Sequence, residues 1–343
     1  MSAKLDELIK EINKNAKEEI ITRGLSDFNY SRIPFTSPRM NYMTYGGLPE
    51  GKLIEFFGEE HGGKTTTALD AVANFQNMYP DREVLFVDAE NSFDVEWARK
   101  IGVDVDRLII LQPKAQSAED IFKIIEDFVA SGEIGLWVLD SLAALLSSAE
   151  MDEKKDYEDK TYGGISLPLT RFAKKIEMLC ARYKCTGIGI NQLRDDLKST
   201  WGGTKTTGGR AWKHFCSVRI QFSRGTFLDE KGNSISRGSE NPAGNIVLAN
   251  AVKNKTAPPS RHVGQYTIKY DIGIDYLSDL VDVAIMYDVI DKAGAWFKII
   301  DTDTGEVLKD KIQGQAKLID VLDSDEKLLQ RVEELTNQKM LDS

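Results

Sequence analysis

The pattern of apolar and polar positions changes its period along the chain and predicts several distinct regions. Near the N-terminus, apolar residues recur at helical spacing from Leu5 to Ile20, with charged residues between them. This predicts an amphipathic helix. Residues 22–47 show no period and contain Pro34 and Pro38, so we expect an irregular linker there. Such a helix can pack on its own core or on the neighbouring subunit of an assembly, and the sequence favours neither.

From Gly51 onward, short apolar runs alternate with helical patterns. The runs KLIEFFG, VLFVD, RLIIL, LWVLD and TGIGIN are separated by expected helices over about 64–79, 94–101, 118–130 and 167–183. This order predicts an α/β fold with a mostly parallel central sheet that is covered on both faces. After Trp212, the runs SVRIQF, NIVLANAV and QYTIKY predict antiparallel strands that extend one edge of the sheet.

The last part of the chain predicts a small α+β domain. It holds the helical pattern LSDLVDVAIMYDVI, an expected hairpin around DTDTGEV and a charged helix from about Asp325. We therefore divide the chain into an N-terminal helix with its linker (1–47), a core (48–271) and a C-terminal domain (272–343).

The composition is that of a soluble globular protein, with 41% hydrophobic and 29% charged residues among 343. No apolar run is long enough to span a bilayer, so we expect no membrane partner, and the charged N-terminal stretch predicts no secretory signal. Three cysteines fit no disulfide or metal pattern; we interpret them as buried thiols of a cytoplasmic protein. Because the net charge is −10, any nucleic-acid site must be local rather than a general positive field.

A phosphate-binding loop is the strongest local motif. It reads GxxxxGKT, follows an apolar strand and opens a helix, which makes a plain glycine-rich turn a weak alternative. Backbone amides of such a loop bind phosphate, the lysine reaches the β- and γ-phosphates, and the threonine hydroxyl ligates Mg²⁺. We therefore predict that ATP and Mg²⁺ bind at Gly58, Glu59, Glu60, His61, Gly62, Gly63, Lys64, Thr65 and Thr66.

Two acidic residues follow expected parallel strands of the same sheet. Asp140 ends LWVLD and is predicted to hold Mg²⁺ together with Thr65, while Glu90 follows VLFVDA and is predicted to polarise a water molecule. A single carboxylate after a strand is usually a helix cap, but two beside a phosphate loop favour an ATPase.

Several ordered segments resemble the bacterial RecA recombinase family. They are DAENSFDVEWARKIGVDVDRLIILQ, GGLPEGKLIEFFGEEHGGKTT, VLDSLAAL, INQLR, TTGGRAWK, AVKNKTAPP and KAGAWF, and they span about Arg32 to Phe297. The resemblance implies a RecA-like P-loop NTPase core, an N-terminal helix for subunit packing, and a helical homo-polymer with ATP between adjacent subunits.

The resemblance also implies roles for residues outside the phosphate loop. Asp94 and Trp97 match the adenine contacts, and Gln192 matches the glutamine that senses the γ-phosphate. Lys253 and Lys255 match lysines donated across the subunit interface, together with Lys64 and Glu90 in the catalytic set. From the residues alone, Lys253 and Lys255 would be solvated charges at a strand end.

Two irregular stretches, 150–164 and 193–212, match the family's DNA-binding loops. The second offers cations for phosphates, glycine amides and Trp201 for stacking on unpaired bases. With the helix that follows the first loop, the predicted DNA-binding residues are Tyr162, Gly163, Gly164, Thr170, Lys174, Arg194, Leu197, Lys198, Trp201, Gly208, Gly209 and Arg210.

The sequence departs from the family pattern at a few places. The first loop is rich in acid, Leu167 and His214 replace a basic and an aromatic residue, and residues 246–251 lack basic side chains. We therefore expect a divergent recombinase, of host or phage origin, that forms filaments on single-stranded DNA and pairs it with homologous double-stranded DNA. The alternatives are a DNA-binding mediator with little ATPase activity and a ring-forming helicase with the same core.

Overall fold

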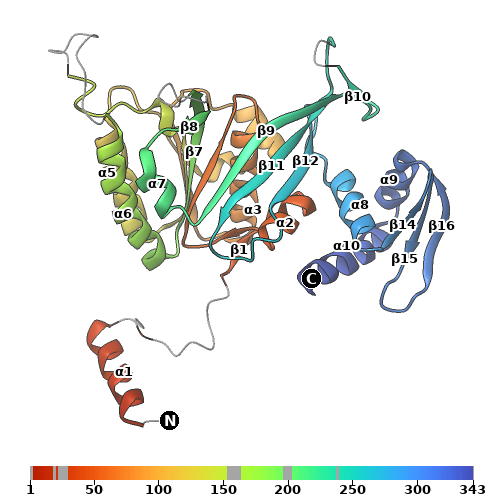
Figure 1. Cartoon of the computed structure of the whole chain (residues 1–343), viewed down its shortest axis with the longest axis horizontal. Helices are drawn as coiled ribbons and strands as arrows, with labels where there is room; N and C mark the ends of the chain where they lie inside the picture. Colours follow the sequence, from red (N-terminus) through yellow and green to blue (C-terminus); the bar gives the residue numbers. More distant parts are fainter. Residues whose placement is uncertain are drawn as a thin grey trace. The chain divides into compact units, whose positions relative to one another are not determined.

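The structure is a computed structural model that describes residues 3–17, 21, 30–152, 164–195, 203–236 and 239–342. The chain divides into two compact units, Met1–Ser31 and Arg32–Ser343. The first contains α1 (Ala3–Ala16), which ends earlier than the predicted Ile20 (Figure 1). The helix stops because Lys17 takes a left-handed backbone conformation, and the side chain of Asn13 then binds the backbone N–H and C=O of Ile21.

The second unit is built on an eleven-stranded sheet, and the fold confirms the predicted α/β class. Its main path runs β13-β12-β11-β9-β3-β7-β6-β4-β5. The strands are β3 (Leu53–Gly58), β4 (Glu83–Asp88), β5 (Leu108–Leu111), β6 (Ile134–Asp140), β7 (Thr186–Asp195), β9 (Val218–Leu228), β11 (Gly244–Asn254), β12 (Val263–Lys269) and β13 (Gly273–Ile274). Two short strands lie off the path: β8 (Thr204–Thr206) pairs with β7 and β10 (Ser234–Ile235) with β9.

The change from parallel to antiparallel pairing comes one strand later than predicted. Strand β9, which contains SVRIQF, is parallel to β3 and antiparallel to β11 and to the short β10. A helix, α7 (Gly209–Phe215), precedes β9 and gives the crossover that a parallel neighbour requires.

Helices cover both faces of the sheet (Figure 1). On one face lies α3 (Lys64–Met78), with α4 (Val95–Ile101) packed against it, and the other face carries α5 (Ala118–Ser131), α6 (Ser166–Tyr183) and α7. Successive strand residues alternate between two buried clusters; Leu53 belongs to one and Ile54 to the other. Short 3₁₀ turns, η1 (Val105–Arg107) and η2 (Leu142–Ala144), complete the connections.

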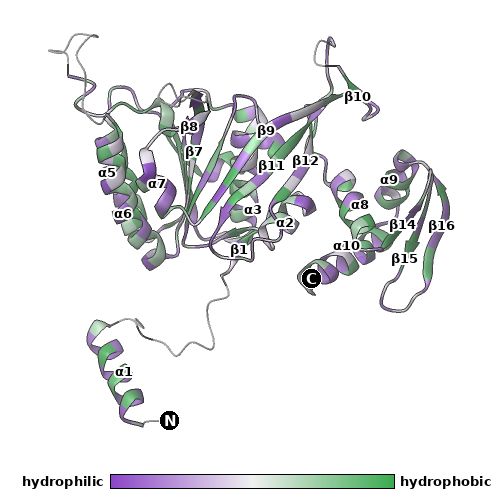
Figure 2. Ribbon diagram, in the orientation of Figure 1, coloured by the Kyte–Doolittle hydropathy of each residue, from purple (hydrophilic) through white to green (hydrophobic). Residues whose placement is uncertain are grey.

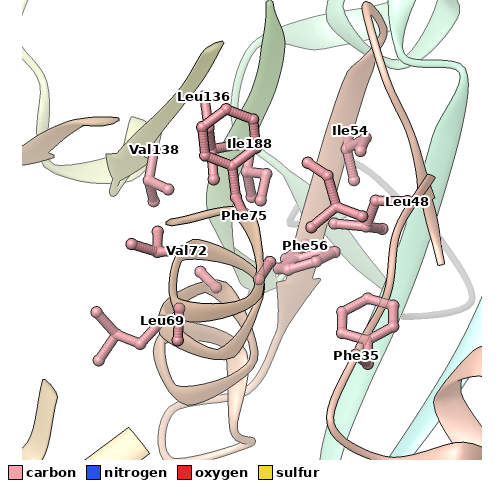
Figure 3. Close-up of a cluster of buried hydrophobic side chains, with 14 of the residues drawn as sticks. Phe35, Leu48, Ile54, Phe56, Leu69, Val72, Phe75, Leu136, Val138 and Ile188 are labelled. Atoms are coloured by element: carbon pink, nitrogen blue, oxygen red, sulfur yellow. The ribbon is translucent and has the colours of Figure 1, made fainter. Parts of the chain in front are cut away.

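The core beneath α3 is apolar and closely packed. Figure 3 shows side chains of α3 facing side chains of β3, β6 and β7, among them Leu69, Val72, Phe75, Ile54, Phe56, Leu136, Val138 and Ile188. In Figure 2 the helices α5 and α6 mix hydrophobic and hydrophilic residues, as helices buried on one side do. This packing fixes the strand ends that carry the predicted site.

Part of the predicted linker is regular structure, so the prediction of an irregular segment up to Gly47 is wrong for residues 32–33 and 38–44. Strand β1 (Arg32–Ile33) pairs with β2 (Leu48–Pro49), and α2 (Pro38–Thr44) follows with Ser37 as its N-cap. Pro38 begins this helix instead of breaking a segment, because the first turn needs no backbone N–H from that position.

The second predicted DNA loop is also less irregular than expected. Strand β8 pairs antiparallel with the last three residues of β7, and α7 begins at Gly209. Residues 196–202 of this loop and 153–163 of the first lie outside the described part of the chain.

The last region has its own apolar core and matches the predicted α+β pattern. It comprises α8 (Tyr276–Met286), β14 (Ile290–Ala293), β15 (Trp296–Ile300), β16 (Val307–Gln313), α9 (Gln315–Ser324) and α10 (Glu326–Asp342). The expected hairpin is the β15–β16 pair. Among the described residues, no helix is long and apolar enough to cross a membrane.

Candidate nucleotide site and DNA-binding loops

The predicted phosphate loop joins the end of β3 to the start of α3. Gly63 caps α3 with a φ of 91°, and a side chain there would come within 2.8 Å of a Val247 methyl group on β11. Glycine is required on both counts. The glycine-rich loop thus leads directly into the first turn of α3. The backbone N–H groups of such a helix N-terminus bind anions.

Lys64 lies inside this loop and is only 8% exposed. Its Nζ donates hydrogen bonds to the carbonyls of Gly58 (3.2 Å) and Glu59 (2.5 Å). Burial lowers the pKa of its ammonium group, and the nearby carboxylates of Asp140 and Glu90 oppose this shift. A buried cation that donates to backbone carbonyl groups is a strong attractor for a phosphate.

Thr65 and Asp140 meet as the sequence predicts for a metal pair. The hydroxyl of Thr65 donates to Asp140 Oδ2 at 2.6 Å. Burial raises the pKa of Asp140 to about 6, and the proximity of Lys64 only partly opposes this. A hydroxyl beside a carboxylate that lacks a full counter-charge is a hard oxygen donor set, so these residues fit Mg²⁺.

Glu90 lies in the loop after β4, and side chains from β7 and from just after β6 reach it. Its Oε1 accepts hydrogen bonds from the Ser141 hydroxyl and from Gln192 Nε2, the latter at 3.0 Å. Sequence reasoning missed Ser141, although its place directly after Asp140 at the end of β6 was a usable signal. The structure thus brings Glu90, Gln192 and the Thr65–Asp140 pair to one edge of the sheet.

A cavity of about 400 Å³ adjoins the phosphate loop. Trp97 forms part of its wall and is held by a 3.2 Å hydrogen bond from its ring Nε1 to the Thr66 hydroxyl. Asp94, in contrast, caps α4 by accepting from the Trp97 backbone N–H and is absent from the cavity lining. Four further lining residues, which the sequence did not reveal, come from distant strands and their ends: Arg224, Asn245, Ile268 and Tyr270.

Lys253 and Lys255 lie at the end of β11 against α7. Lys253 Nζ donates to the carbonyls of Lys213 (2.6 Å) and His214 (2.9 Å), and Lys255 Nζ donates to His214 at 3.2 Å. Both cations therefore cap the C-terminal end of α7, where they also balance the helix dipole. Lys253 is half-buried, so it is more than a solvated strand-end charge, whereas Lys255 is exposed.

The predicted DNA-binding residues fall into two groups. Five of them lie outside the described residues: Tyr162, Gly163, Leu197, Lys198 and Trp201. Of the others, Lys174, Gly209 and Arg210 are exposed, and Gly164 is half-buried.

Three members of the second group contact the protein itself. Thr170 donates to the Ser166 carbonyl within α6, and Arg194 donates to the Ala143 carbonyl at 3.0 Å. Gly208 is buried at the N-cap of α7. The two ends of the second loop, near Arg194 and Gly208, thus lie against the core.

Comparisons with known proteins agree with this geometry. The family model of the RecA N-terminal domain matches residues 3–275. Protein RecA of Fusobacterium nucleatum is 36% identical over 310 residues, which cover 90% of this chain and 76% of that protein. Protein RecA of Mycoplasma mycoides is 33% identical over 347 residues (98% and 94%), and that of Chloroherpeton thalassium is 33% identical over 347 residues (98% and 91%). The chain therefore belongs to the RecA family.

Proposed function

We propose that this protein is a recombinase that binds ATP with Mg²⁺, polymerises on single-stranded DNA and pairs that DNA with homologous double-stranded DNA. Its membership of the RecA family makes it a DNA-dependent ATPase of recombination and repair. We place this activity in the cytoplasm, and the three buried free thiols agree with a reducing compartment.

The phosphate site supports the chemical part of the proposal. Lys64 would leave its two carbonyl partners for the β- and γ-phosphates, which are stronger acceptors. Thr65 and Asp140 would hold Mg²⁺, which supplies positive charge against the phosphate oxygens. Glu90 would accept a proton from the attacking water, and Trp97 would stack on the base.

One observation carries the link between ATP and DNA. Strand β7 places Gln192 against Glu90 and then continues to Asp195, into the predicted second DNA loop. When γ-phosphate is present, the Gln192 amide would turn from Glu90 to the phosphate, freeing the carboxylate for water and shifting the arm of the loop. Nucleotide would thereby raise DNA affinity, and hydrolysis would lower it.

Lys253 and Lys255 would make hydrolysis depend on polymerisation. If a neighbouring subunit presents its nucleotide to them, phosphate competes with the carbonyls of α7 for the same cations. Helix α1, whose Leu5 and Leu8 are exposed, would supply subunit packing.

Electron microscopy with single-stranded DNA and a slowly hydrolysed ATP analogue tests this assembly. Helical filaments that require both DNA and nucleotide would support the proposal. Closed rings would favour the helicase alternative, and DNA binding without any nucleotide dependence would favour the mediator.

A further inference from the structure

We propose that Asn191 is a positioning residue that couples the nucleotide site to the second DNA loop, an inference that rests on the proposed function. Its side chain makes three hydrogen bonds. Oδ1 accepts from the backbone N–H of Gln192 at 3.0 Å, and Nδ2 donates to Glu55 Oε1 and to the Thr207 carbonyl, each at 2.9 Å. The Asn191 amide is thus bonded to Gln192, which contacts Glu90, to the buried Glu55, and to Thr207 at the end of the second DNA loop that leads into α7.

Glu55 fixes the orientation of this amide. It is fully buried in β3, and its other oxygen pairs with Nε of Arg219, its register neighbour on β9. Removing a partner from a buried charge is costly, so the Glu55 carboxylate holds both Arg219 and Asn191 in place. Because the two donors and the acceptor of Asn191 are all engaged, its amide cannot rotate to absorb a movement of the Gln192 backbone. The movement is passed to Thr207 instead.

Thr207 is the point where such a movement reaches the loop and α7. It follows the last residue of β8 and precedes Gly208, the N-cap of α7. Helix α7 also lies close to β7, since a side chain added at Gly189 would come within 2.5 Å of the Trp212 ring. Its far end is held by Lys253. Asn191 therefore holds the one end of α7 that is continuous with the DNA loop.

A purely structural role for Asn191 makes a different prediction from coupling. If Asn191 is purely structural, its replacement should lower thermal stability and weaken DNA binding equally with and without nucleotide. If Asn191 couples the two sites, its replacement should change the ratio of the two DNA affinities.

The test measures this ratio for the full-length protein with a fluorescent oligothymidine, with and without a slowly hydrolysed ATP analogue. In Asn191→Ala we expect the ratio to fall about tenfold, within the usual range for coupling between sites, while analogue affinity stays within about twofold. If the alanine variant does not fold, Asn191→Ser serves in its place, because its hydroxyl is too short to join Glu55 and Thr207. A wild-type ratio in a folded variant would overturn the proposal.

One control variant separates coupling from stability. Asn41→Ala removes a similar side-chain brace, to the backbone of Phe35, away from the site. It should lower stability alone. Loss of the ratio in this control would show that the ratio merely follows stability and would reject the role of Asn191. A wild-type protein without any nucleotide-dependent ratio would instead reject the proposed function.

Discussion

The side-chain amide of Gln192 donates a 3.0 Å hydrogen bond to the carboxylate of Glu90. The two residues lie 102 positions apart in the sequence, and β6 runs between their strands in the sheet. The contact connects the predicted base of ATP hydrolysis to the strand that leads into the second DNA loop. A change at the γ-phosphate can therefore reach DNA through one short segment of backbone.

Removal of the Lys64 ammonium should abolish useful nucleotide binding. Lys64→Ala is expected to weaken the affinity for an ATP analogue by about a hundredfold, because charged hydrogen bonds to two phosphates are lost. Isothermal titration calorimetry checks this. The control is Lys123→Ala, whose exposed cation pairs with Asp127 on the surface of α5. Wild-type affinity in Lys64→Ala would contradict the phosphate-site assignment.

The Glu90 carboxylate should be needed for hydrolysis but not for binding. Glu90→Gln keeps the size of the side chain but cannot accept the proton, so turnover should fall by about 10² to 10⁴. DNA affinity in the presence of ATP should persist, because the bound nucleotide is no longer consumed. Glu96→Gln, in the first turn of α4, is the matched control. Unchanged turnover in Glu90→Gln would show that another group activates the water.

Trp201 should contribute to DNA binding and not to nucleotide binding. Loss of one stacked base is expected to weaken oligothymidine affinity about tenfold in Trp201→Ala. Fluorescence anisotropy measures it, with Trp296→Ala, half-exposed in β15, as the control for loss of a tryptophan. Equal DNA titrations for both variants would remove Trp201 from the DNA site.

Asp70 should make stability depend on pH. Burial raises its pKa to about 6, although it accepts hydrogen bonds from Thr36 and Asn74. A carboxyl with a higher pKa in the folded than in the unfolded state holds its proton more tightly when folded. The free energy of unfolding should therefore fall as the pH rises from about 4 to about 6, by about 3 kcal/mol, and then level off.

Urea unfolding at the two ends of this range checks the Asp70 contribution. The decrease should be smaller in Asp70→Asn, which carries no titrating group at this position. An identical decrease in both proteins would mean that Asp70 does not titrate in this window.

Deletion of α1 should leave a folded core that polymerises poorly. The core is a separate compact unit, so it should keep its thermal midpoint while filament length falls. Light scattering and electron microscopy measure this. Filaments of normal length would reject a role for α1 in assembly.

The residues of the phosphate site could be predicted from local sequence motifs. Lys64, Thr65, Asp140 and Glu90 follow apolar strands, and the carboxyl ends of parallel strands share one edge, so their convergence could be inferred. Helix α2 was missed because two prolines indicate a loop unless one occupies a first helical turn.

The contacts that depend on tertiary pairing could not be inferred. Nothing near Lys253 in the sequence reveals the carbonyls of α7, and two of the partners of Asn191, Glu55 and Thr207, lie far from it in the sequence. Resemblance supplied expected roles for single residues, but not the bonds between them.

ATP hydrolysis with and without single-stranded DNA tests the central claim most directly. It is measured at low salt because phosphate contacts weaken as salt rises. Strong stimulation by DNA is the predicted result, since Gln192 links the hydrolytic site to the second loop. Hydrolysis that DNA does not change, in a protein that still binds DNA, would contradict the account.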